Sequence, residues 1–193
     1  MLYYCLLSTV YLIMDKEQPE VLSSEEVFGG RLISVSRDTV REGEQTYLRE
    51  VVRHPGGAAV VPYFEDGTVA FVSQYRHPAR KYVLELPAGK LDPGERPAET
   101  AARELEEELG VVAGRWEQLS EFYTTPGFCA ERLWVFLATG LRETARRHEE
   151  DELIEVVRVP FVRALEMVAS GEIEDAKTII GLLLAARRLG VGA

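Results

Sequence analysis

The sequence predicts an α/β protein in which a mixed sheet lies between helices. Runs of alternating apolar and polar residues, typical of strands, recur along the chain, and three segments are helical in composition or spacing. With 193 residues, 46% of them hydrophobic, the chain can bury the core of one domain with a small appendage. Its formal net charge of −10 argues against non-specific binding to nucleic acid or to anionic membranes.

A small antiparallel sheet is expected before the main domain. Its predicted strands cover residues 27–35, 39–40 and 46–52, and the hinge is the run His54-Pro55-Gly56-Gly57. The first thirteen residues are apolar, contain no Lys or Arg, and are too short to span a bilayer. We expect translation to start at Met14, with an extra N-terminal strand as the alternative. The expected organisation is an extension at 1–13, a β-sheet subdomain for dimerisation at 14–56 and a main domain at 57–193.

The main domain is expected to begin with a hairpin. Residues 58–64 and 68–74 are predicted to pair across the turn Glu65-Asp66-Gly67. Further strands are expected at 82–86, 116–123, 133–139 and 153–159. Helices are expected from Pro160 to about Ala169, before Gly171, and from about Asp175 to Leu189. Cys5 and Cys129 indicate no disulfide framework, so we expect a cytoplasmic protein.

An acidic helix is predicted after the turn Asp92-Pro93-Gly94. Residues 97–109 are mostly Ala, Glu, Leu and Arg; Pro97 suits the first turn, and Gly110 can end the helix. At 100° per residue, the predicted apolar stripe consists of Ala98, Ala101, Ala102, Leu105 and Leu109.

Three carboxylates of this helix point in nearly the same direction. Glu107 and Glu108 flank Glu104, and like charges at this spacing destabilise a helix unless a cation compensates them. Carboxylate oxygens without a nearby histidine or thiolate favour Mg²⁺ or Mn²⁺ over zinc. The alternative is a solvated acidic helix face.

The stretch GKLDPGERPAETAARELEEELGV, residues 89–111, resembles the Nudix box, and all seven literal positions of that signature are filled. The resemblance implies a Nudix-type α/β/α sandwich that hydrolyses a nucleoside diphosphate linked to another group, with two or three divalent ions. The metal ligands that it implies are Glu104, Glu107, Glu108 and the main-chain oxygen of Ala88. Arg103 resembles the arginine that orients a box glutamate; a surface arginine paired with Glu99 or Glu107 is the alternative.

Two further segments resemble those of ADP-ribose pyrophosphatases. Pro126, followed by Gly127, lies sixteen residues beyond Gly110, where that subfamily has a marker proline; a plain turn is the alternative. The acidic run at 149–152 matches a Glu-x-Glu-x-Ile pattern, which implies Glu150 as general base and Glu152 as metal ligand; a solvated loop is the alternative. The implied reaction converts ADP-ribose to AMP and ribose 5-phosphate.

Other substrate contacts are expected at strand ends. Arg53 and Arg76 are candidates for holding the pyrophosphate or terminal ribose, with surface ion pairs as the alternative. The resemblance also implies a homodimer that exchanges the N-terminal sheet, from which Phe28 could stack on adenine; a core position for Phe28 is the favoured interpretation. Rival functions are cleavage of another nucleoside diphosphate sugar, such as GDP-mannose or ADP-glucose, and a non-catalytic ADP-ribose sensor.

Overall fold

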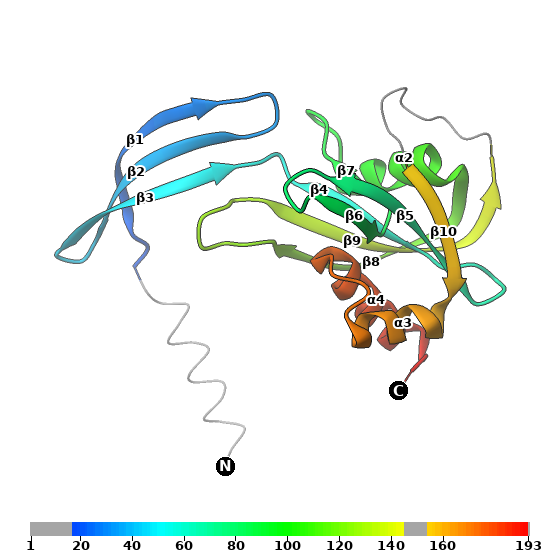
Figure 1. Cartoon of the computed structure of the whole chain (residues 1–193). Helices are drawn as coiled ribbons and strands as arrows, with labels where there is room; N and C mark the ends of the chain where they lie inside the picture. Colours follow the sequence, from blue (N-terminus) through cyan, green and yellow to red (C-terminus); the bar gives the residue numbers. More distant parts are fainter. Residues whose placement is uncertain (1–16, 145–153, 193) are drawn as a thin grey trace, which may run out of the picture. The chain divides into compact units, whose positions relative to one another are not determined.

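The computed structural model describes residues 17–144 and 154–192, which form two compact units divided between Arg53 and His54 (Figure 1). The expected extension at 1–13 lies outside the described residues. No helix in the described part of the chain is both long and apolar enough to cross a membrane.

The N-terminal unit is a three-stranded antiparallel sheet in the order β1-β2-β3. Its strands are β1 (Glu20–Gly29), β2 (Ser34–Glu42) and β3 (Gln45–Arg53). The predicted antiparallel sheet is confirmed, but the strand expected at 27–35 is wrong. The chain turns between Gly29 and Ser34, where Gly30 donates a hydrogen bond to the carbonyl of Ile33 at 2.9 Å, so this segment contributes to two strands.

The second unit contains two sheets. One is mixed, in the order β7-β4-β9-β8, with β4 (Gly57–Pro62) parallel to β9 (Arg132–Glu143) and antiparallel to β7 (Ala88–Lys90). The long strand β8 (Val111–Tyr123) completes it. The other sheet is antiparallel and consists of β10 (Ile154–Pro160), β5 (Thr68–Arg76) and β6 (Lys81–Glu85).

The expected hairpin of residues 58–64 with 68–74 is wrong. Strands β4 and β5 belong to different sheets, and the described link between their ends is a single bridge from Tyr63 to Val69. All six residues of β4 are buried, so this strand needs cover on both faces. In the mixed sheet, β4 is covered on both faces. The turn at 65–67 then leads the chain into β5 of the second sheet.

In the described residues of this unit, three helices cover the sheets. Figure 1 shows α2 (Pro97–Leu109) on one side and α3 (Phe161–Ser170) with α4 (Ala176–Leu189) on the other. Alternate residues of β4 follow this layering: Ala58 and Val60 pack with α2, whereas Ala59 and Val61 pack with α3 and α4. The predicted α/β/α sandwich is therefore confirmed.

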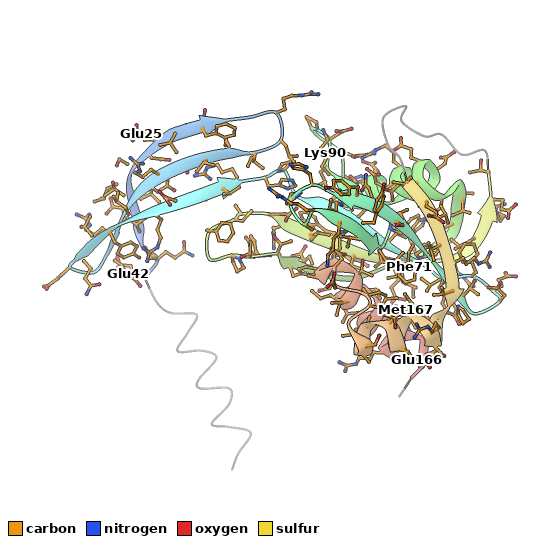
Figure 2. All side chains as sticks on the ribbon, viewed as in Figure 1. Glu25, Glu42, Phe71, Lys90, Glu166 and Met167 are labelled. Carbon is orange, nitrogen blue, oxygen red and sulfur yellow. The ribbon has the colours of Figure 1, made fainter. Side chains whose placement is uncertain are left out.

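The core beneath α4 is tightly packed. Phe71 of β5, labelled in Figure 2, is fully buried in it. At Gly181 of α4, an added Cβ would lie 2.6 Å from Leu86 and 3.2 Å from Val61. A glycine at this position thus allows α4 to approach the sheets closely, which fixes the chain segment that leads from β6 into β7.

Candidate active site

The buried side of α2 differs from the predicted apolar stripe. Ala101 and Leu105 are buried as expected, but Ala98 and Ala102 are exposed, and Thr100 and Glu108 are buried instead. The prediction assumed that apolar residues alone define the inner face. In the structure that face is rotated toward the carboxylates, so α2 presents acidic side chains to the sheet. The helix ends at Gly110, with φ 67°, as predicted.

Two glutamates of α2 contact the backbone of β7. The carboxylate of Glu104 lies against Gly89, where an added Cβ would be only 1.7 Å from its Oε1. The Ala88 N–H donates to Oε2 of Glu108 at 3.2 Å. The first glycine of the acidic motif is therefore a steric requirement, because any side chain there would displace a carboxylate.

Arg103 connects the three carboxylates that surround it. Its Nη1 donates to Glu104 at 2.7 Å and to Glu107 at 2.9 Å, while its Nε donates to Glu95 at 3.0 Å. Its Nη2 reaches the second oxygen of Glu95 at 3.2 Å and the carbonyl of Lys90 at 3.3 Å. Of the alternative pairings with Glu99 or Glu107, the structure contains the one with Glu107, whereas Glu99 binds Arg96.

Glu95 anchors this arginine. The hydrogen bonds from Arg103 lower the pKa of Glu95 to about 2, and the same hydrogen bonds raise the pKa of Arg103. The Glu95 carboxylate also accepts from the Asp92 N–H at 3.1 Å and from the Thr100 hydroxyl at 2.8 Å. Glu95 thus joins the turn before α2 to the side chain that holds Glu104 and Glu107.

The donor chemistry at this site fits a hard divalent cation. Glu104, Glu107 and Glu108 supply carboxylate oxygens beside β7, and Mg²⁺ and Mn²⁺ prefer such ligands. Across residues 17–144 and 154–192, no three His, Cys, Asp or Glu side chains are already grouped around a metal position. Arg103 and the Ala88 N–H occupy oxygens of the cluster. The predicted base Glu150 and ligand Glu152 lie outside the described residues.

Arg76, at the end of β5, is held by a glutamate that the sequence reasoning missed. Its Nε and Nη2 donate to the two oxygens of Glu85 at 2.7 and 2.8 Å. These hydrogen bonds raise the pKa of Arg76, and the charges of Glu85, Glu108 and Asp175 raise it further. Arg76 therefore lies close enough to Glu108 of α2 to be affected by its charge. The sequence signal for Glu85 was a carboxylate that directly follows the apolar residues 82–84.

The remaining predicted contacts lie in two other places. Pro126 and Gly127 are exposed in the loop between β8 and β9, where Cys129 donates to the Thr125 carbonyl at 3.0 Å, so the plain turn is present. In the N-terminal unit, the exposed Arg53 side chain forms an ion pair with the buried Asp38 at 3.6 Å. Phe28 is 54% exposed, so the expected core position is wrong.

The fold and the acidic motif define the class of this protein. Residues 53–180 match the model of the NUDIX domain. The chain belongs to the NUDIX family.

Individual relatives match most of the chain. It is 40% identical to an ADP-ribose pyrophosphatase of Bacillus subtilis over 86% of its length and 91% of the relative's. It is 42% identical to an ADP-ribose pyrophosphatase of Mycobacterium tuberculosis over 88% and 84% of the two chains. A methanol dehydrogenase activator of Bacillus methanolicus is 38% identical over 86% and 91%. A crystal structure titled as an ADP compounds hydrolase has the same fold, with a TM-score of 0.80, 24% identity and coverage of 91% and 96%.

Proposed function

We propose that this protein hydrolyses the pyrophosphate of ADP-ribose to AMP and ribose 5-phosphate with the help of divalent metal ions. The observation that carries the proposal is the acidic cluster of α2, held by Arg103 against the backbone of Ala88 and Gly89. Similarity to two relatives named ADP-ribose pyrophosphatase, at 40% and 42% identity, supports the substrate.

The metal-binding groups that we propose are the side chains of Glu104, Glu107, Glu108 and Glu152 and the main-chain oxygen of Ala88. Two or three Mg²⁺ or Mn²⁺ ions bound there would neutralise phosphate charge and lower the pKa of the attacking water. Arg103 orients Glu104 and Glu107 through its hydrogen bonds and offsets their mutual repulsion. Glu150 accepts the proton of the water, and Arg76 binds the pyrophosphate.

We propose a cytoplasmic homodimer in which the N-terminal sheet of each protomer contributes to the partner's site. The sheet exposes large apolar side chains: Val21 is 57%, Phe28 54% and Leu48 61% exposed. Exposed apolar residues gathered on a small sheet favour an interface. Phe28 and Arg53, together with Pro126 and Gly127, are the proposed contacts to the adenosine and terminal ribose.

The proposal is tested by measuring AMP release with Mg²⁺ and with Mn²⁺. The substrates are ADP-ribose, ADP-glucose, GDP-mannose, NADH and nucleoside triphosphates, and we expect a strong preference for ADP-ribose. Preference for another nucleotide sugar would retain the metal chemistry and overturn the substrate assignment. Binding of ADP-ribose without turnover of any substrate would instead favour a sensor.

Two variants test the role of the acidic cluster. We expect Glu108→Gln to reduce turnover by orders of magnitude, because it removes a carboxylate from the proposed metal site. Glu106→Gln is the matched control, since Glu106 lies on the same helix but forms no contact in the described Arg103 cluster. Comparable activity in both variants, with folding intact by circular dichroism, would contradict the site assignment.

A further inference from the structure

Glu85 has no role in the mechanism above, although it is a buried acid beside the proposed site. We propose that Glu85 is a positioning residue that fixes Arg76 for binding the substrate pyrophosphate, and that the first turn of α4 in turn fixes Glu85. This inference rests on the proposed function, but only on the pyrophosphate that all nucleoside diphosphate sugars share.

The contact with Glu85 directs one edge of the Arg76 guanidinium away from that carboxylate. Nε and Nη2 bind the two oxygens of Glu85 in a bidentate contact, at 2.7 and 2.8 Å. A guanidinium carries five N–H donors in a rigid plane, so Glu85 holds one edge and orients the other. The Arg76 side chain is 42% exposed, whereas that of Glu85 is 3% exposed. The edge that faces away from Glu85 belongs to a partly exposed side chain, so it can meet a phosphate from solvent while Glu85 holds the other edge.

Glu85 is kept charged in a buried position. Burial raises the pKa of Glu85, but the hydrogen bonds and charges of Arg76 and Lys177 outweigh this effect and hold the pKa below its usual range. Buried ion networks are often no more stable than well-packed apolar residues of similar volume. Stability alone is thus a weak reason for a carboxylate at this position, and orienting Arg76 is a specific one.

The first turn of α4 holds Glu85 and the backbone next to it. Lys177 forms an ion pair with Glu85 and a second one with Asp175 at 3.0 Å. Asp175 caps the helix by accepting from the Thr178 N–H at 2.9 Å. The Thr178 hydroxyl accepts from the Leu86 N–H at 2.8 Å and donates to Asp175 at 2.6 Å. One turn of α4 thus fixes the chain just before Ala88.

The test compares Glu85→Gln with Glu174→Gln. The control removes the exposed ion pair of Glu174 with Lys81, which joins the start of β6 to the segment before α4. Lys81 pairs with Arg76 through the backbone of the β5–β6 ladder, but Glu174 is not among the described partners of the Arg76 guanidinium. We expect Glu85→Gln to raise KM for ADP-ribose about 10-fold or more, the size typical of side chains that orient a ligand-binding group, with a smaller change in kcat. Glu174→Gln should leave both constants within about twofold of wild type.

The direction of the change in KM distinguishes the loss of Arg76 orientation from a general effect of removing a negative charge. Removing a negative charge near an anionic substrate would by itself lower KM, because the site becomes more positive. The proposal predicts the opposite sign. It also predicts that Glu85→Gln adds nothing to KM in an Arg76→Gln background, since Glu85 acts through Arg76. An unchanged or lower KM in the folded single variant, or an additive effect in the double variant, would overturn the proposal.

Two provisions keep the test decisive. If Glu85→Gln does not fold, Glu85→Asp keeps the charge but shortens the side chain by one methylene, and it should raise KM in the same direction. If the wild type hydrolyses no substrate, the proposed function fails. Calorimetric titration with ADP-ribose then tests separately whether Glu85 positions Arg76 for binding. A Kd weakened in Glu85→Gln but not in Glu174→Gln supports this role of Glu85. Equal Kd values, or no binding to the wild type, overturn it.

Discussion

Replacing Gly89 by alanine perturbs the proposed metal site with a single methyl group. The added Cβ would lie 1.7 Å from Oε1 of Glu104, and Cβ contacts below 3.0 Å are essentially absent from proteins. If the β7 backbone stays in place, the carboxylate oxygen must therefore move by at least 3.0 − 1.7 = 1.3 Å. Displacement of a catalytic group by about 1 Å can cost on the order of 10²-fold in rate, so we expect kcat to fall about 100-fold.

The fold should tolerate Gly89→Ala much better than the activity does. Moving Glu104 weakens its hydrogen bond with Arg103, which is 2.7 Å long. Such a bond to a charged group contributes about 1.5–3 kcal/mol, while alanine in a strand regains about 0.5–1 kcal/mol relative to glycine. The free energy of unfolding should thus decrease by about 0.5–2.5 kcal/mol.

The assay measures AMP release together with urea unfolding of the same preparation. Gly114→Ala in β8 is the matched control, because its added Cβ would meet the Gly140 carbonyl at 3.3 Å and no carboxylate. We expect this control to keep kcat. A kcat within about threefold of wild type in Gly89→Ala would show that displacing the Glu104 carboxylate does not impair catalysis. The proposed dependence of catalysis on the position of Glu104 would then be wrong.

Three further predictions concern the Arg103 cluster and the proposed metal site. Arg103→Lys should lower turnover by about 10-fold or more with little change in circular dichroism. The reason is that an ammonium group cannot replace the planar guanidinium that contacts Glu95, Glu104 and Glu107. Normal turnover in this variant would contradict an orienting role for Arg103. The pKa of Glu95 is lowered from 4.5 to about 2, so its ionised form stabilises the fold above pH 4.5, and this contribution is lost as the pH falls toward 2. Urea unfolding should therefore show wild type more stable than Glu95→Gln at pH 7 and the difference shrinking between pH 4.5 and 2; a constant difference would refute the ion pair. Removal of divalent ions with EDTA should abolish turnover while circular dichroism stays unchanged, and Mg²⁺ or Mn²⁺ should restore it; turnover in EDTA would exclude the proposed metal dependence.

Local patterns predicted the acidic helix and its boundaries. Pro97 and Gly110 mark its ends, and residues between them are strong helix formers, so the assignment depends on neighbours in sequence. The same reasoning identified Ala101 and Leu105 of the inner face correctly but placed Ala98 and Ala102 there wrongly. Ala98 and Ala102 are exposed because Glu104 and Glu108 turn toward β7, a partner that lies outside the helix.

Two strands of the main domain, too, were predicted correctly as elements but not in their tertiary contacts. The apolar runs at 58–64 and 68–74 were recognised as strands, but their pairing with each other was wrong. A short turn between two strands permits a hairpin, yet it equally permits passage from one sheet to another. The choice depends on the parallel pairing of β4 with β9, more than seventy residues later in the chain.

By itself, the sequence determined the fold class and the acidic motif, and it predicted a hard divalent cation there, since these inferences follow from residue types at short spacing. Only the tertiary structure decided that Arg103 joins Glu95 to Glu104 and Glu107, and that Glu85 holds Arg76 with the support of α4. The physical reason is that Glu85 and Lys177 are separated by more than ninety residues. Their ion pair exists because packing brings the end of β6 to the start of α4. The periodicity of residues along the chain does not predict that contact.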